Sequence, residues 1–433
     1  MLLTAIITLT MPQQPAATAE FVVPVIRADE GREVQPMRAF SQGITADGHG
    51  QLWALVHDSG PGDEPERQLL MLCSTDGGAT WQRRSRTPMP WSTFGALCGA
   101  PGSDVLHVAW TTRLAGSEFS SAVYQRFDAE QGAWLGEPEV LQTGKGAENQ
   151  FGIGDFARAA DGTLLVLVTT HRRPGAPWPS GWSTGLMLRQ PGADSFAEPL
   201  VVNTSTFGVW ANLQVRGGRA HASFRSSPMH SIIAYRSLDL TAGRWLEDEA
   251  PEISVGPDTG RTVANASSLL VGPDDHRTVV YPAARQQAGA LRGPGGADNG
   301  ANGNGCLLIA FADGSGSWRT TTLIEDPGLE SGNIGHENFV LTPGPGHQVI
   351  ALYSRFDEQH RVLYRRVIER GEPIGREEVV QRAELDGAFA RLSAVRDARL
   401  LTRVQALVGG IGPGAELGVR AVLGRGRLPT RWQ

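Results

Sequence analysis

Short apolar runs that fit β-strands recur along the chain at a regular interval. The strongest runs begin near residues 51, 105, 163, 219, 277, 347 and 399, and each follows a weaker strand and a turn with Asp or Gly. Their spacing, roughly 52–70 residues, is slightly above the about 40–50 residues of a four-stranded propeller blade. No segment shows a helical period of useful length. We therefore predict an all-β protein, a seven-bladed β-propeller of four-stranded blades.

The last blade needs a strand from the start of the chain. Blade one has four predicted strands: Phe40–Ala46, Gln51–His57, Gln68–Cys73 and Thr80–Arg84. Blade seven shows only three: Phe389–Val395, Arg399–Leu407 and Glu416–Leu423. The segment Phe21–Ile26 would supply the fourth strand and close the ring, which hides exposed strand edges. The longest interval contains the low-complexity insert Gln286–Gly305, predicted as a mobile loop between the second and third strands of blade five.

Composition supports this architecture and excludes some partners. The chain has 54 Gly and 27 Pro but only 19% charged residues, as expected for many strands joined by tight turns. A net charge of -6 gives no electrostatic case for nucleic acid. No apolar run reaches the roughly 20 residues that a membrane span needs. Residues 1–19 resemble a secretory signal ending at Ala19, so we expect a secreted or periplasmic protein whose single propeller domain covers residues 20–433.

Metal and cofactor chemistry find no support in the sequence. Cys73, Cys98 and Cys306 each lie in an apolar strand pattern, and no Cys/His spacing resembles a metal site. We expect no cofactor, while a structural Ca²⁺ and a bond between Cys73 and Cys98 stay open. We also expect a monomer.

One motif carries a family resemblance. The segment Ser74-Thr-Asp76-Gly-Gly78-Ala-Thr80-Trp81 matches S-x-D-x-G-x-T-W, the Asp-box of neuraminidase-repeat proteins. Asp76 can accept bonds from backbone amides ahead of it, Gly78 supplies a positive φ, and Trp81 packs its ring, so the motif is structural. Shorter copies follow Asp128, Asp239 and Asp313. The chain resembles the sialidase-like propellers, and its seven blades resemble the ulvan lyases more than the six-bladed sialidases.

Polar residues gather at the face opposite the Asp-box turn, where first strands start and second strands end. Arginines recur there at one level of the ring, which suits a carboxylate or sulfate. The predicted substrate-binding residues are Arg38, Trp210, Asn212, Arg225, Arg285, Arg355 and Arg391. The predicted catalytic residues are Asp58, His336, Glu337 and Tyr353.

The catalytic assignments rest on two patterns. His336-Glu337-Asn338 is the densest polar triplet at this face, and either His336 or Glu337 could act as acid or base. Tyr353 beside Glu337 would imitate the tyrosine nucleophile of sialidases if the two side chains come within hydrogen-bond distance. The segment from Phe207 to Arg225 is similar to the aromatic-then-arginine blade of ulvan lyases. Trp210 stands near the expected tyrosine there, so the base role does not transfer.

Three functions therefore stay open. The leading hypothesis is a sialidase-like glycosidase that hydrolyses an acidic, carboxylated glycan. The first alternative is a polysaccharide lyase that eliminates at a uronate, with Arg225 or a neighbour on the carboxylate and a His or Tyr as base. The second is a propeller that binds a glycan or a protein without catalysis. The expected partner is an anionic oligosaccharide or polysaccharide.

Overall fold

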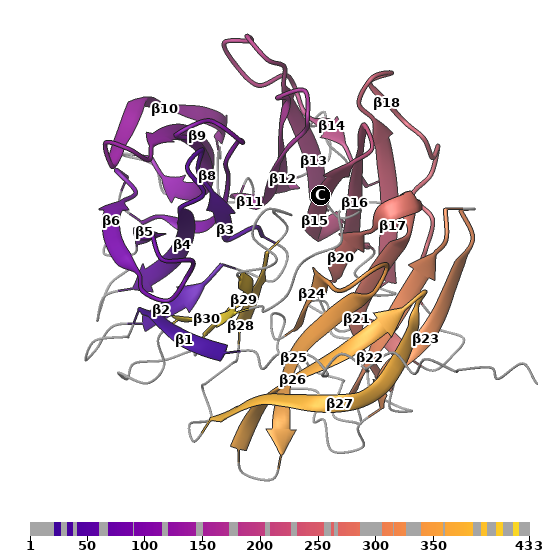
Figure 1. Cartoon of the computed structure of the whole chain (residues 1–433). Helices are drawn as coiled ribbons and strands as arrows, with labels where there is room; N and C mark the ends of the chain where they lie inside the picture. Colours follow the sequence, from indigo (N-terminus) through magenta and orange to yellow (C-terminus); the bar gives the residue numbers. More distant parts are fainter. Residues whose placement is uncertain are drawn as a thin grey trace, which may run out of the picture.

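The strands of the protein form seven antiparallel sheets arranged in a ring. The computed structural model describes residues 21–26, 33–37, 41–59, 68–89, 91–114, 120–143, 150–172, 181–203, 208–226, 232–254, 261–263, 267–285, 305–314, 316–325, 339–357, 360–383, 391–395, 404–409 and 419–423. The sheets surround the inner strands β3, β11, β15, β20, β24 and β28 (Figure 1). The predicted seven-bladed propeller is confirmed.

Each blade has four strand positions, which we name a to d from the axis outward. Position a holds β2 (Glu33–Pro36) and β3 (Ile44–Ala46), β7 (Thr93–Cys98), β11 (Gln150–Arg158), β15 (Gly208–Arg216), β19 (Arg261–Val263) and β20 (Ser268–Val271), β24 (Phe339–Pro343) and β28 (Arg391–Ala394). Position b holds β4 (Leu52–Ser59), β8 (Val105–Arg113), β12 (Leu164–Arg172), β16 (Arg219–Ser226), β21 (Arg277–Arg285), β25 (Val349–Asp357) and β29 (Val404–Gly409). Position c holds β5 (Gln68–Ser74), β9 (Ser120–Asp128), β13 (Gly181–Arg189), β17 (Ile232–Asp239), β22 (Gly305–Ala312), β26 (His360–Glu369) and β30 (Val419–Leu423). Position d holds β6 (Gln82–Arg86), β10 (Ala133–Thr143), β14 (Leu200–Val201), β18 (Arg244–Trp245), β23 (Trp318–Glu325), β27 (Glu372–Ala383) and β1 (Phe21–Ile26).

Alternating side chains bury both faces of the b strands. In β4, Leu52 and Val56 pack in a cluster with blade seven, while Trp53 and Leu55 pack in a cluster with blade two. Seven such clusters of described residues fill the seven blade interfaces. Because apolar residues are needed on both sides, these strands read as nearly continuous apolar runs, and this is why the sequence revealed them.

The ring is closed by the N-terminal strand, as predicted. β1 pairs antiparallel with β30, with Phe21 opposite Leu423. Val25 lies in the apolar cluster between blades seven and one. The first blade and the last are thus joined by backbone hydrogen bonds and by a shared core.

One strand prediction needs correction, and another is tested only in part. Blade one was predicted to have one inner strand, Phe40–Ala46, but β2 and β3 both pair with β4. Between these two strands, Ser41 and Gln42 bond to blade three instead. In blade seven, β29 (Val404–Gly409) forms strand b within the predicted range, and residues 399–403 lie outside the described residues.

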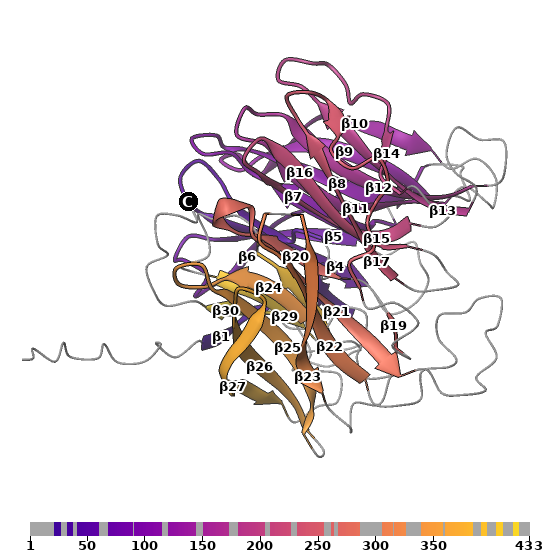
Figure 2. The ribbon, with the colours of Figure 1, turned by 90° about the vertical axis from the view of Figure 1, so that its right-hand side faces the viewer.

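The propeller has two different faces. The a–b and c–d turns lie on one, which we name the turn face, and the b–c and d–a connections lie on the other, the loop face. In blade five, the 3-10 turn η3 (Pro273–Asp275) precedes β21, while β19 pairs with the opposite end of β21, and Figure 2 shows η3 and β19 on opposite sides. The insert joins β21 to β22 as predicted, and its residues 286–304 lie outside the described residues.

Candidate functional site

Arginines mark the loop face in five consecutive blades. From blade two to blade six, each b strand carries an arginine within its last three residues. These arginines are Arg113, Arg172, Arg225, Arg285 and Arg355. The backbones of these five arginines therefore lie at a similar height in the ring, which we call the level of arginines, although the chain has a net charge of -6.

For several predicted site residues, either the whole residue or its side chain lies outside the described part of the structure. Arg38, His336 and Glu337 lie outside the described residues. The backbones of Trp210, Arg285 and Arg391 are described, at the loop ends of β15, β21 and β28, but their side chains are not. Whether Glu337 approaches Tyr353 therefore stays a prediction.

A polar seam separates blades four and five. On β16, Ala220, Ala222 and Phe224 pack toward blade three, so the alternate positions face blade five. These positions are Arg219, His221, Ser223 and Arg225. The other face of this strand is apolar, so the polar row is specific to one interface.

The seam holds two predicted site residues. Asn212 is fully buried and donates from Nδ2 to the backbone oxygen of Ser267 at 2.6 Å. Ser223 Oγ lies 3.0 Å from Ser267 Oγ. Arg225, near the loop end of the same row, is 2% exposed. The structure places both side chains inside a blade interface, and their predicted role in substrate binding stays a prediction.

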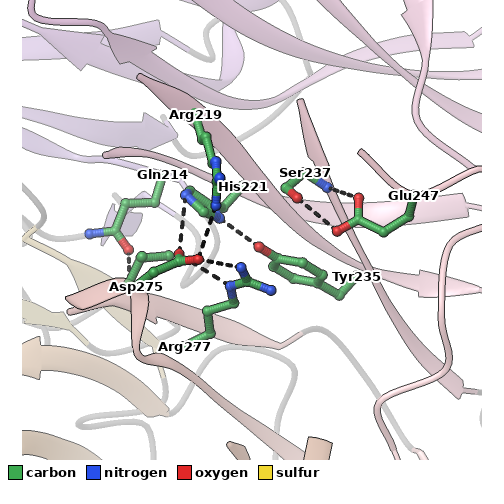
Figure 3. A network of polar contacts seen from close by, with 9 residues as sticks. Gln214, Arg219, His221, Tyr235, Ser237, Glu247, Asp275 and Arg277 are labelled. Atoms are coloured by element: carbon green, nitrogen blue, oxygen red, sulfur yellow. Dashed lines mark hydrogen bonds and ion pairs between the residues drawn. The ribbon is translucent and has the colours of Figure 1, made fainter. Parts of the chain in front are cut away.

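The turn-face half of the seam is a charged network (Figure 3). Asp275 Oδ2 lies 3.2 Å from a guanidinium nitrogen of Arg219, and Asp275 Oδ1 accepts from Arg277 Nε at 3.2 Å. His221 Nδ1 lies 2.5 Å from the Tyr235 hydroxyl, and His221 Nε2 lies 3.9 Å from Asp275. The carboxylate of Asp275 thus lies between two arginines and a histidine.

The environment sets the protonation of this network. Burial lowers the pKa of His221 and raises the pKa of Tyr235. Burial by itself raises the pKa of Asp275. The hydrogen bonds and the charge of Arg277 outweigh this effect and hold the pKa below the ordinary value. With His221 neutral and Tyr235 protonated, the tautomer of the imidazole determines which of the two groups donates this hydrogen bond. We interpret the network as a structural link that holds blades four and five together, because its charged and polar groups bind one another.

A buried carboxylate ties the inner strands together. Asp155 of β11 is fully buried. Its Oδ1 accepts from the backbone N–H of Gln42 and of Phe156, both at 2.9 Å, and its Oδ2 accepts from Leu213 N–H at 2.8 Å. Ser41 Oγ also donates to Gly154 O at 2.5 Å. Blades one and three are not neighbours in the ring, so their chains meet on the axial side of blade two.

Sequence reasoning missed Asp155. A usable signal was present, since an aspartate stands inside the apolar strand Gln150–Arg158, where a charge is costly unless it is bonded. The two N–H donors from other blades lie 113 and 58 residues away in the chain. No local pattern reveals partners that distant.

Tyr353 has a partner other than the predicted one. Its hydroxyl donates to Glu377 on β27, the outermost strand of the same blade. Arg355 forms an ion pair with the same carboxylate and lies 4.7 Å above the Tyr364 ring. Tyr353 is 1% exposed, and burial together with Glu377 raises its pKa. A protonated tyrosine buried between blades five and six is poorly suited to act as a nucleophile.

Asp58 lies at the loop end of β4, two residues after Val56 in strand b of blade one. It is 1% exposed, and its backbone pairs with Val34 of β2 and Gln68 of β5. The structure places it at the predicted face but inside the blade. Its acid role stays a prediction.

The Asp-box segment forms the c–d turn of blade one, on the turn face. Asp76 accepts from the N–H of Thr80 at 2.9 Å and from the Ser74 hydroxyl at 2.8 Å. These bonds lower the pKa of Asp76 to about 2, and the bonds with Thr80 have the largest effect. Gly78 has φ 99°, and Trp81 Nε1 donates to its carbonyl at 3.0 Å. The bonds match the structural role predicted for the segment.

The described residues hold no candidate metal centre. Among them, no group of three or more His, Cys, Asp or Glu side chains is placed to bind a metal ion. The three cysteines are buried free thiols. No helix in the described part of the chain is long and apolar enough to cross a membrane.

Known proteins resemble this chain in fold but not in sequence. No protein-family model matches it, and no curated protein does. An ulvan lyase of polysaccharide lyase family PL25, solved bound to -[GlcA(1-4)Rha3S]-, matches 94% of this chain and 96% of its own, with TM-score 0.59 and 11% identity. The polysaccharide lyase Uly1 matches 94% of this chain and 98% of its own, with TM-score 0.56 and 9% identity.

The chain has the fold of the ulvan lyases. The resemblance expected from the blade count is thereby confirmed at the level of fold. The microbial sialidase Hz136 matches 74% of this chain and 64% of its own, with TM-score 0.42 and 14% identity.

Proposed function

We propose that this protein is a carbohydrate-active enzyme that cleaves an acidic polysaccharide on its loop face. The observation that carries the proposal is the level of arginines, one at the loop end of strand b in each of five consecutive blades. Guanidinium groups bind carboxylate and sulfate through paired hydrogen bonds. The fold shared with two polysaccharide lyases supports the same substrate class. A polymeric substrate is consistent with export, so we also propose that the protein acts outside the cytoplasm.

Elimination at a uronate is the reaction that we favour over hydrolysis. In this reaction a cation neutralises the uronate carboxylate, a base removes the proton on the adjacent carbon, and the glycosidic oxygen leaves from the next carbon. Arg285 or another arginine at the loop ends would neutralise the carboxylate, because Arg225 is 2% exposed inside a blade interface. His171, beside Arg172 at the loop end of β12, and His336 are the candidate bases. Hydrolysis by a tyrosine nucleophile is less favoured because Tyr353 is buried and bonded to Glu377.

Product chemistry tests the proposal. The protein is incubated with ulvan, polygalacturonate, alginate and polysialic acid, and both ultraviolet absorbance and new reducing ends are followed. Elimination produces an unsaturated uronate that absorbs in the ultraviolet, with one new reducing end for each absorbing product. New reducing ends without absorbance would show hydrolysis instead. Binding without either signal would show a non-catalytic propeller, and neither binding nor turnover on any acidic polymer would refute the proposal.

An arginine variant tests the assignment of the site. Arg285→Lys keeps the charge but removes the paired hydrogen bonds. One charge-assisted hydrogen bond contributes about 1.5–3 kcal/mol, so we expect turnover to fall by about 10- to 100-fold. The control is Arg219→Lys, at the turn face of blade four, which should leave turnover unchanged. Equal turnover in both variants would remove Arg285 from the site.

A further inference from the structure

The connection from β6 to β7 presents an aromatic side chain at the loop face. Trp91 lies two residues before β7, whose first residue Thr93 pairs with Thr111 near the loop end of β8. Trp91 is half-buried, whereas Trp53 and Trp110, in the apolar cluster between blades one and two, are almost fully buried. Trp91 is therefore only partly covered at the rim of blade two, and its Nε1 is buried.

The backbone around Trp91 is strained. Trp91 has φ 51° and Phe94 has φ 37°, a region that side chains other than glycine rarely adopt. The register of β7 against β8 also shifts between Thr93 and Gly95, which marks a bulge. Bulges redirect side chains and are frequent beside active sites, and strained residues cluster at ligand-binding sites. Ser92 Oγ donates to Met89 O at 2.7 Å and helps to hold this conformation.

Hydrogen bonding does not explain the position of Trp91. Other indoles near turns are anchored, since Trp53 Nε1 donates to Asp47 and Trp81 Nε1 donates to Gly78 O. Trp91 Nε1 makes no hydrogen bond within the described residues. The contact that orients the ring is with Arg113, the last residue of β8, whose Cζ lies 4.0 Å from the ring centroid. A strained backbone that leaves a buried indole N–H without a hydrogen bond among the described residues is unfavourable for folding, which favours a role in binding.

The Arg113 guanidinium also carries N–H donors on its edge, and these suit an anion. The ring contact uses the flat face of Arg113, while hydrogen bonds to a carboxylate or sulfate use the edge of a guanidinium. The accessible part of an indole covers the apolar face of a sugar ring, and the neighbouring cation selects a charged substituent. Together the two side chains present the chemistry that recognises an acidic sugar unit.

We propose that Trp91 and Arg113 form a second subsite, which binds another acidic sugar unit of the polysaccharide. This proposal rests on the proposed function. The pair belongs to blade two, whereas Arg285 belongs to blade five, and both lie on the loop face. The polymer would therefore cross the loop face from blade five to blade two. The subsite contributes affinity for long chains and not for the shortest ones.

Two variants and a matched control test this subsite. Trp91→Phe keeps an aromatic ring but shortens it, and Arg113→Lys keeps the charge but removes the stacked fork. Trp81→Phe is the control, because Trp81 is also half-buried but lies in the turn-face turn of blade one. Dissociation constants are measured by calorimetry for the acidic polymer that the wild type binds best and for its disaccharide. Thermal unfolding confirms that each variant is folded.

The expected pattern separates the two proposals. Trp91→Phe and Arg113→Lys should weaken polymer binding by about five- to tenfold, the effect of losing roughly one hydrogen bond or ring contact, and leave disaccharide binding unchanged. If Trp91→Phe does not fold, Arg113→Lys alone decides the matter. Polymer binding equal to that of Trp81→Phe would overturn the subsite alone. A wild type that binds no acidic polymer would overturn the proposed function and the subsite together.

Discussion

Replacing Asp155 should destabilise the propeller more than any substitution of an exposed aspartate. The carboxylate accepts three backbone N–H groups, from Gln42, Phe156 and Leu213, at 2.9, 2.9 and 2.8 Å. An unsatisfied buried donor costs about 1–3 kcal/mol, so Asp155→Ala should cost roughly 3–9 kcal/mol. That is a large part of the about 5–15 kcal/mol that keeps a domain folded, and this variant is expected to express poorly.

Asp155→Asn is therefore the informative variant. The amide oxygen can still accept from Gln42 and Phe156, but the amide NH₂ then faces the N–H of Leu213. One lost acceptor should lower the free energy of unfolding by about 1–3 kcal/mol. The control is Asp161→Asn, because Asp161 also bonds Thr163 in blade three but is exposed. Urea unfolding followed by tryptophan fluorescence gives both values, and an Asp155→Asn midpoint equal to that of Asp161→Asn would refute the reasoning.

Two further predictions concern buried titratable groups. Burial lowers the pKa of His107 to about 4 from its ordinary 6.5, so between these pH values the unfolded chain binds a proton that the folded chain does not. Stability should then fall as pH drops from 6.5 toward 4, by up to about 3 kcal/mol, and be insensitive to this group above pH 7. Urea midpoints across this range should fall less steeply in His107→Gln, and identical slopes would contradict the assignment. Tyr353→Phe should keep wild-type turnover and lose only some stability, because the hydroxyl is buried and bonded to Glu377. If a folded Tyr353→Phe variant lost turnover, Tyr353 would again be a candidate catalytic residue.

The fold was predictable because its signals are local. Each b strand is buried on both faces, so its apolar run stands out, and the turn after Ser74 has its own motif. The level of arginines was predictable for the same reason, since strand ends follow from strand starts. The fourth strand of blade seven was found because Phe21–Ile26 had no other blade to join.

The contacts inside the site were not predictable, because they depend on distant segments and on irregular strands. The pairing of Tyr353 with Glu377 coincides with a register shift in β27 between the partners of Arg365 and Val367. The departure of Ser41 and Gln42 from blade one makes sense only once Asp155 of blade three is placed beside them. Apolar periodicity contains no information on either feature.

The central claim is that the loop face acts on a polysaccharide through its carboxylates. The most direct test compares two forms of the acidic polymer that the protein cleaves best among those tried: the native form, and the same polymer with its carboxylates chemically reduced to alcohols. Chain length and linkage stay the same, so only the anionic group changes. The account predicts cleavage of the native polymer and no detectable cleavage of the reduced one. Equal rates on both polymers would contradict it.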